Sequence, residues 1–400
     1  MGPYVIEWLN LLVRLLHVVA AIAWIGASFY FIALDYTLRP PKDERDSERG
    51  VAGETWEIHG GGFYRIEKFR LAPATLPERL TWFKWEAYTT WLSGFVLLVV
   101  LYYLNPDAYL IDPSVADIAP IVAIGISIGI LVVGWLVYDG LCRLLEGRDG
   151  LLALILAAVV IGVAYGASEF FSGRAVYIQV GAMLGTWMAA NVFFVIIPGH
   201  WDLVRAKNAG QEPDPLPALR GKQRSVHNNY LTLPAIFAML SNHFPMTYGH
   251  EYGWLILVVI LGVLVAVRHF FNLRHQGRTV WAIPVAAAVA MAAVAIAIAP
   301  WGQATASGGP DASPVAFETV HGIIEARCQV CHSEHPTQEG FSAPPLGVTF
   351  DTPEQIQAQA ARIEQMAVIT KAMPLGNVTG MTQEERETLG VWIRQGAKLD

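Results

Sequence analysis

Long apolar stretches separated by short polar segments run through the first three quarters of the chain. A membrane-spanning helix needs about 20 predominantly apolar residues, because each residue advances it by only about 1.5 Å. Stretches of that length predict eight spans, near residues 5–34, 85–104, 116–140, 151–171, 175–198, 229–247, 252–272 and 279–301. We therefore expect an all-α fold, a polytopic transmembrane helix bundle of about eight spans, with both chain ends on one side.

The pattern changes after the last predicted span. Residues 302–314 are rich in Gly, Ala, Ser and Pro, which favours a flexible linker. Apolar periodicity then returns in residues 315–326 and in residues 382–395, which predicts two helices that pack across each other. We thus divide the chain into a transmembrane domain (1–301), a linker (302–314) and a small helical domain (315–400).

Composition agrees with a membrane protein. Hydrophobic residues make up 54% of the chain and charged residues only 15%, with a mean hydropathy of +0.40. A soluble protein of this length would not show such values. We expect the lipid bilayer to be a partner and expect no nucleic-acid partner.

Basic residues in the loops predict the orientation. The segments 35–84 and 199–228 carry many Lys and Arg residues, whereas 105–115 and 248–251 carry none. Cytoplasmic loops are enriched in Lys and Arg, so both termini are expected on the outer side. The predicted location is the bacterial inner membrane, with periplasmic N- and C-termini.

A CxxCH motif, Cys328-Gln329-Val330-Cys331-His332, lies in the last domain. Two thiols at this spacing can form thioethers to one porphyrin, and the adjacent imidazole can then bind the iron. A zinc knuckle or a thioredoxin-like dithiol would be the alternative, but no second Cys pair and no βαβ pattern accompany the motif. The sequence therefore predicts a covalent haem c in a cytochrome c-like domain.

A second axial ligand is expected downstream of the motif. Met373, followed by Pro374, offers a thioether in a predicted loop. Met366 and Met381 are the competitors, but Met366 falls in a helical-looking stretch and Met381 lies beside the cap of the last helix. We predict that His332 and Met373 bind the haem iron.

Ionisable residues inside the predicted spans are candidates for function, because each is costly in hydrocarbon. Arg14 and His17 share one face of the first span, His243 lies toward the outer side, and His227-Asn228-Asn229 and Arg268-His269 lie toward the inner side. Any one of these histidines alone could be structural. As a set they could hold a non-covalent haem b, and Arg14 could bind a propionate or an anionic substrate.

Residues 55–67 have a different pattern. Alternating side chains flank Gly60-Gly61, which predicts a small β-hairpin on the cytoplasmic side.

The chain resembles the membrane-bound cytochrome c urate oxidases. The resemblance covers nearly all 400 residues and rests on five segments: Leu16–Tyr30, His59–Tyr64, His227–Pro234, Ser241–Pro245 and the terminal CxxCH domain. It implies that urate and water give 5-hydroxyisourate, with electrons passing through haem c and no hydrogen peroxide formed. The first span is also similar to that of membrane haem-b proteins, which implies a haem-ligand role for His17.

The predicted catalytic residues are accordingly few and polar. They are Arg14, His17, His227, Asn228, Asn229 and His243. Urate is a planar anion, so its site should offer a cation, amide groups, an aromatic face and a base. A soluble cytochrome c or a terminal oxidase is the expected electron acceptor.

Two other functions stay open from the sequence. The spans could hold haem b and a quinol site that feeds haem c, which would make the protein an electron carrier. A permease or sensor fused to a cytochrome is the third hypothesis, although the chain shows no internal repeat.

Overall fold

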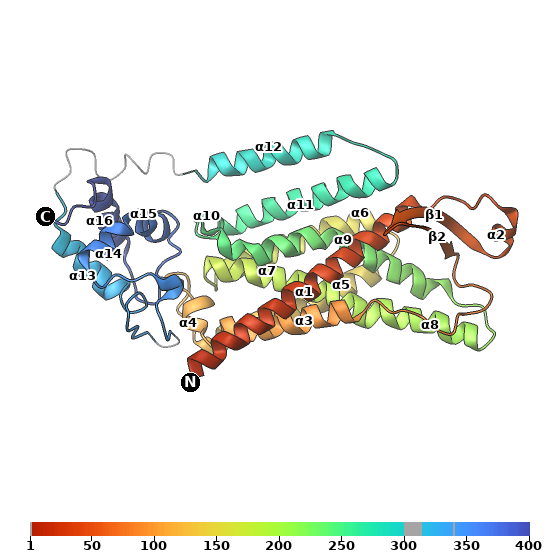
Figure 1. Cartoon of the computed structure of the whole chain (residues 1–400), viewed down its shortest axis with the longest axis horizontal. Coiled ribbons are helices and arrows are strands. Elements are labelled where there is room, and N and C mark those ends of the chain that lie inside the picture. Colours follow the sequence, from red (N-terminus) through yellow and green to blue (C-terminus); the bar gives the residue numbers. More distant parts are fainter. Residues whose placement is uncertain (1, 300–313, 339–340) are drawn as a thin grey trace.

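The protein is described by a computed structural model that covers residues 2–299, 314–338 and 341–400. Long helices run side by side along one axis and form the bundle (Figure 1). Its helices are α1 (Gly2–Thr37), α3 (Trp85–Leu98), α5 (Pro120–Leu144), α6 (Asp149–Ser168), α7 (Gly173–Asn191), α8 (Ile197–Asn208), α9 (Pro215–Leu240), α11 (Gly253–His275) and α12 (Ala282–Ala297), with short helices α2 (Glu44–Glu48), α4 (Pro106–Tyr109) and α10 (Pro245–Tyr248). π-helical turns extend α3 through Val99–Tyr103 and join α7 to α8 through Val192–Ile196.

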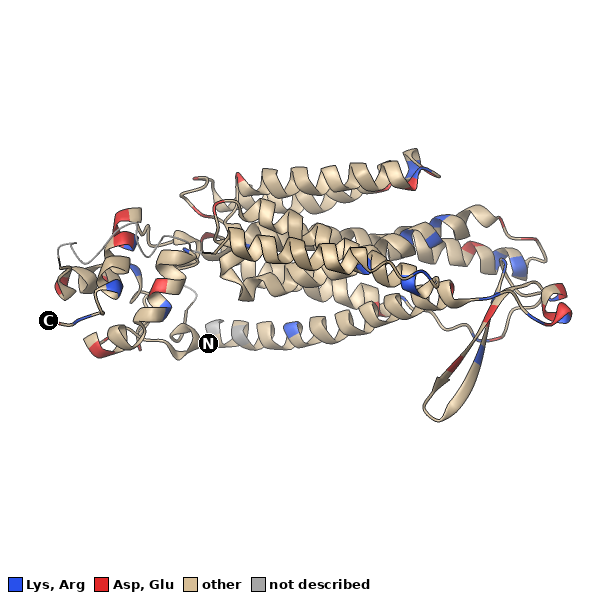
Figure 2. Ribbon diagram, turned by 90° about the horizontal axis from the view of Figure 1, so that it is seen from above, with Lys and Arg blue, Asp and Glu red and all other residues tan. Residues whose placement is uncertain are grey.

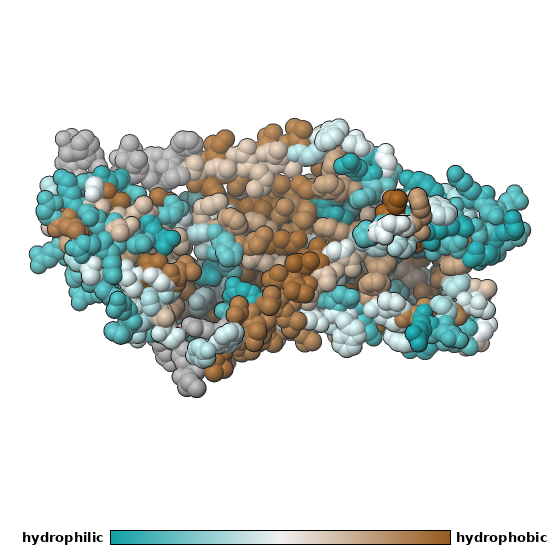
Figure 3. All heavy atoms as spheres, in the orientation of Figure 1, coloured by the Kyte–Doolittle hydropathy of each residue, from teal (hydrophilic) through white to brown (hydrophobic). Residues whose placement is uncertain are grey.

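The all-α membrane bundle predicted from the sequence is confirmed. Within the described residues, six helical segments are long and apolar enough to cross a membrane, and α12 is a shorter apolar helix. The sixth predicted span, 229–247, falls on α9, which begins 14 residues earlier than predicted and ends at Leu240. On the face shown in Figure 3, a hydrophobic band crosses the bundle between two hydrophilic ends.

The two ends of the bundle differ in what they carry. The N-terminus and the C-terminal region lie at one end, and the hairpin and α8 lie at the other (Figure 1). Charged residues avoid the middle of the bundle and gather toward its ends (Figure 2). Both chain ends therefore lie on one side, as predicted.

The predicted hairpin is present. Strands β1 (Val51–His59) and β2 (Gly62–Phe69) pair antiparallel, with His59 opposite Gly62. Gly60 and Gly61 have φ values of 56° and 81°, which glycine adopts without strain, so the sequence can make this two-residue turn. Arg65 on β2 pairs with Glu54 on β1 and with Asp46 on α2, which fixes the base of the hairpin.

The centre of the bundle is α7, whose side chains are the most extensively buried. Its close neighbour is α9, because a Cβ added at Gly181 would lie 2.4 Å from the Cβ of Ala238. The two backbones can approach this closely only because residue 181 has no side chain. This packing positions the polar face of α9 inside the bundle.

The C-terminal region has its own hydrophobic core. It contains α13 (Phe317–Arg327), α14 (Pro353–Ala358), α15 (Ala360–Ile363) and α16 (Gln383–Arg394). Capping boxes at Thr352 and Thr382 start α14 and α16. The expected packing of the two terminal helices is confirmed by Phe317 of α13, whose ring lies 5.9 Å from that of Trp392 on α16.

This region lies against the end of the bundle that carries the N-terminus (Figure 1). A Cβ added at Gly376 would lie 2.8 Å from the carbonyl oxygen of Ile111, and one at Gly249 would clash with the carbonyl oxygen of Thr370. These are close backbone contacts between the two parts. The predicted linker, 302–314, lies outside the described residues except for Pro314, so the division into domains stays a prediction.

Candidate functional site

A buried polar network crosses the half of the bundle nearer the hairpin. Nη2 of Arg224 on α9 donates to Oδ1 of Asp139 on α5 (2.7 Å), and Nη1 donates to Oδ1 of Asn191 on α7 (3.2 Å). Asn191 in turn donates to the Tyr138 hydroxyl (2.9 Å) and to Oδ1 of Asn228 (2.8 Å). Buried polar groups in a membrane protein need such hydrogen-bonding partners, and the partners of Arg224 include the carboxylate of Asp139.

His227 belongs to this network. The Tyr138 oxygen lies 2.8 Å from its Nδ1, and the Tyr138 ring stacks on Trp187 with centroids 4.6 Å apart. Asn228 also donates to the carbonyl oxygen of Met188 at 3.0 Å. The predicted residues His227 and Asn228 thus lie together among aromatic and amide groups.

The third predicted residue of this run, Asn229, lies in a separate group with α11. Its Oδ1 accepts hydrogen bonds from Nε of Arg268 (2.9 Å) and Nδ2 of Asn272 (3.0 Å). The Arg268 guanidinium carbon lies 3.9 Å from the centre of the Phe29 ring on α1. Here a buried cation, two amides and an aromatic face converge.

His17 lies between α1, α3 and α9. Its Nδ1 is 2.9 Å from the carbonyl oxygen of Thr90, which can only accept, so Nδ1 carries the proton. Its Nε2 then keeps a lone pair and lies 3.2 Å from Sδ of Met239. Because neither atom has a proton to donate, this contact is not a hydrogen bond, and the Nε2 lone pair is one that could bind a metal.

The predicted residues do not form one site. His227 and Met239 are 12 residues apart on α9, which separates the His227 network from His17 by about 18 Å along the helix. Arg14 is exposed on α1 and donates to Asn10 one turn earlier. His243 is exposed in the turn Ser241–His243, which follows α9. The structure therefore gathers His227 to Asn229 inside the bundle and leaves Arg14 and His243 on its surface.

The CxxCH motif forms a turn at the end of α13. Cys331 and His332 both donate their backbone N–H to the carbonyl oxygen of Cys328, at 3.1 and 2.9 Å. Burial raises the pKa of the Cys328 thiol to about 12, which favours a neutral sulfur. A thioether is neutral, whereas a zinc-bound thiolate is not, so this environment fits the predicted attachment.

The geometry of His332 suits an iron ligand. Its Nδ1 lies 3.0 Å from the carbonyl oxygen of Val348, which leaves the Nε2 lone pair free. Met381 is buried in the hydrophobic core of the region. Met373 lies in a loop, and its carbonyl oxygen accepts a hydrogen bond from Nη1 of Arg386 at 2.7 Å. Met373 stays the predicted second ligand.

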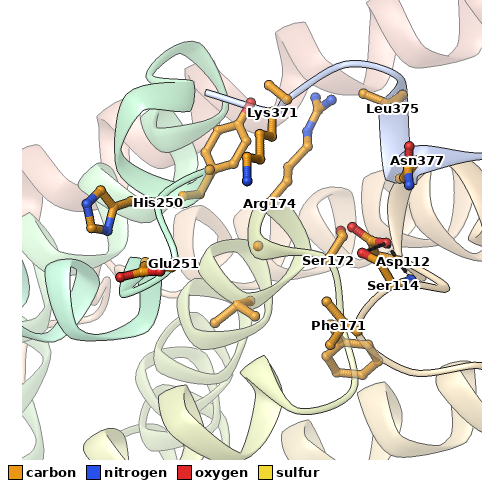
Figure 4. Close-up of a pocket in the computed structure, with 18 of the residues that line it drawn as sticks. Asp112, Ser114, Phe171, Ser172, Arg174, His250, Glu251, Lys371, Leu375 and Asn377 are labelled. Carbon is orange, nitrogen blue, oxygen red and sulfur yellow. Dashed lines mark hydrogen bonds between the residues drawn. The ribbon is translucent and has the colours of Figure 1, made fainter. Parts of the chain in front are cut away.

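A cavity of about 440 Å³ lies where the C-terminal region meets the bundle (Figure 4). Arg174 and Asp112 line it from the bundle, and Lys371 and Asn377 line it from the C-terminal region. Nε of Arg174 donates to Oδ1 of Asn242 at 2.8 Å. This junction brings the loop that contains Met373 next to the ends of the bundle helices.

Sequence reasoning missed Met239 and Asn272, and it noted Arg268 as an ionisable residue inside a span without predicting a role for it. Met239 carries no polar signal, so nothing marked it as the partner of His17. Arg268 and Asn272 are polar residues one turn apart in an apolar helix, a signal that costly burial in hydrocarbon makes informative. Their convergence on Asn229 depends on how α9 and α11 face each other, which the linear sequence does not specify.

Residues 3–299 match the family described as Urate oxidase N-terminal. A search of the curated proteins and of the solved structures finds no significant match.

Proposed function

The chain belongs to the urate oxidase N-terminal family, and on that basis we propose that this membrane oxidoreductase oxidises urate and passes the electrons to a C-terminal haem c. The family match supports urate as the substrate, and the CxxCH turn supports haem c as the electron acceptor. The match ends at residue 299, so the haem c domain is inferred from residues 315–400 themselves.

The reaction balances with water as the oxygen source. A water oxygen bonds to carbon 5 of the urate ring, which gives 5-hydroxyisourate, two protons and two electrons. A haem c accepts single electrons, so two transfers follow each turnover and molecular oxygen is not consumed. A soluble cytochrome c or a terminal oxidase then removes the electrons, and no hydrogen peroxide forms.

Cys328 and Cys331 would hold the haem c, and His332 and Met373 would bind its iron. The contact between the C-terminal region and the bundle supports transfer from the helices to this region, because Gly376 lies directly against the carbonyl of Ile111. Periplasmic termini and an inner-membrane location follow if the basic loops are cytoplasmic.

We also propose that the membrane domain holds a haem b. His17 would supply the ligand, since its Nδ1–H is held by Thr90 and its Nε2 is free toward Met239. Such a group would offer a one-electron acceptor between the inner polar groups and the junction. The proposal therefore includes a haem b whose iron is bound by His17 and not by His227.

The test is an anaerobic titration of the purified, oxidised chain with urate. Urate should convert the oxidised haem spectrum to the reduced one, and a pyridine haemochrome count should give the number and type of haems. His17→Ala should block reduction while the covalent haem remains. Reduction by a quinol, with no response to urate, would favour the electron-carrier alternative instead.

A further inference from the structure

Three buried polar atoms without partners lie in one hydrogen-bonded group on α9 and α11. They are Nη2 of Arg268, Nδ2 of Asn229 and Oδ1 of Asn272. The side chains are almost completely buried, since Arg268, Asn229 and Asn272 are 5%, 0% and 1% exposed. Each such atom costs free energy in the empty bundle, so their clustering points to a missing ligand.

The orientation of both amides follows from Arg268. A guanidinium only donates, so the Asn229 atom that receives Nε of Arg268 must be oxygen. The same oxygen receives the amide of Asn272, so the atom of Asn272 that faces it must be nitrogen. The free atoms are therefore a charged donor, a neutral donor and one acceptor.

The charge of Arg268 is also uncompensated. Among the described residues, no carboxylate lies within 4.0 Å of it, whereas Arg224 in the same bundle pairs with Asp139 at 2.7 Å. The guanidinium instead packs on the Phe29 ring. An isolated buried cation is unfavourable unless an anion joins it.

We propose that Arg268, Asn229 and Asn272 bind an anionic, planar lactam ring, with Phe29 packed behind the guanidinium. Carbonyl or anionic ring atoms of the ligand would accept from Arg268 and Asn229, and a ring N–H would donate to Asn272. A carboxylate or phosphate satisfies the two donors but leaves Asn272 Oδ1 unpaired. Urate has both kinds of group, so this inference deepens the proposed function and rests on it for the identity of the ligand.

The test measures binding of urate to the full chain in detergent by equilibrium dialysis, together with the thermal unfolding midpoint. Arg268→Gln should weaken urate binding roughly ten- to a hundredfold, the effect of losing a hydrogen bond to a charged group. Without urate, its unfolding midpoint should equal or exceed that of the wild type, because an unpaired buried charge is gone. Benzoate, an anion without N–H groups, should bind the wild type at least tenfold more weakly than urate.

Asn272→Asp gives a second variant that does not depend on how Arg268→Gln folds. The new carboxylate, one turn from Arg268, should abolish urate binding by pairing with the guanidinium, and it can no longer donate to the Asn229 oxygen. Arg174→Gln is the matched control, because Arg174 lines the junction cavity and is partnered by Asn242. It should leave urate affinity unchanged.

Unchanged urate affinity in Arg268→Gln, or loss of affinity in Arg174→Gln alone, would overturn the assignment. So would a lowered midpoint of Arg268→Gln without urate, which would indicate a structural arginine. Haem reduction by urate in the wild type, measured in parallel, separates the two proposals: reduction without dependence on Arg268 rejects only this site, and binding that depends on Arg268 without reduction rejects only the oxidation.

Discussion

The hydroxyl of Tyr138 lies 2.8 Å from Nδ1 of His227 and joins it to the Asn191 amide. Arg224 donates to Asn191 Oδ1 and so leaves the Asn191 amide N–H groups to donate to the Tyr138 oxygen. The Tyr138 hydroxyl therefore connects the imidazole of His227 to the Arg224 and Asp139 ion pair through Asn191.

Tyr138→Phe should destabilise the bundle. The substitution leaves His227 Nδ1 and one Asn191 N–H without a partner in a buried setting, at a cost of about 1–3 kcal/mol in the free energy of unfolding. Chemical unfolding in detergent measures this. Tyr165→Phe is the matched control, since Tyr165 is 51% exposed, and it should change stability by less than about 0.5 kcal/mol. Equal stability of the two variants would show that the Tyr138 hydrogen bond contributes nothing.

Gly94→Ala should move the His17 side chain while residue 17 itself stays a histidine. A Cβ at residue 94 would lie 2.8 Å from Cε1 of the His17 ring, so the imidazole must move away from the carbonyl of Thr90. We expect slower haem reduction by urate and an altered absorption spectrum of any haem bound at His17. Gly129→Ala in α5, where a Cβ meets nothing within 4 Å, is the control and should behave like the wild type. An unchanged Gly94→Ala enzyme would argue against a role for the His17 position.

Gly181→Ala should loosen the contact between α7 and α9. The new methyl would overlap Ala238, and overpacking of this kind costs about 1–3 kcal/mol. Gly185→Ala, one turn along the same helix, has open space and should be neutral or slightly stabilising, because alanine is the better helix former. Unfolding midpoints of the pair measure the difference, and similar midpoints would mean that the helices can separate freely.

The sequence predicted the bundle well because length and apolar composition suffice to define a lipid-facing helix. It missed the start of α9, whose first 14 residues include the exposed Arg220 and Lys222 as well as the buried Arg224, because the apolar pattern marks only the part of a helix that has an apolar exterior. The capping residue Thr382 and the Gly60-Gly61 turn act locally, and so the elements beside them were predictable.

The sites were less predictable for a physical reason. The apolar pattern of a span does not specify how far the helix is rotated about its axis. It also does not specify which residues of neighbouring helices lie at the same depth in the bundle. His227 and Asn229 are two residues apart on α9, yet one contacts Tyr138 of α5 and the other Arg268 of α11. Arg14 was grouped with His17 by helical spacing, but its guanidinium lies on the outside of α1 with Asn10. Only the packing of whole helices separates these cases.

Replacing methionines one at a time should identify the second axial ligand of haem c. Met373→Leu should remove the near-infrared absorption typical of methionine-bound ferric haem and lower the midpoint potential, because a thioether ligand raises it. Met381→Leu should keep both properties and lose less than about 1.5 kcal/mol of stability, since Met381 is a core residue and leucine has a similar volume. Met366→Leu should also keep both properties. The backbone carbonyl of residue 366 accepts the backbone N–H of Met373 at 3.0 Å, and this contact holds the loop whatever the side chain at position 366. Loss of the band in Met366→Leu or Met381→Leu, with Met373→Leu unaffected, would move the ligand to that residue.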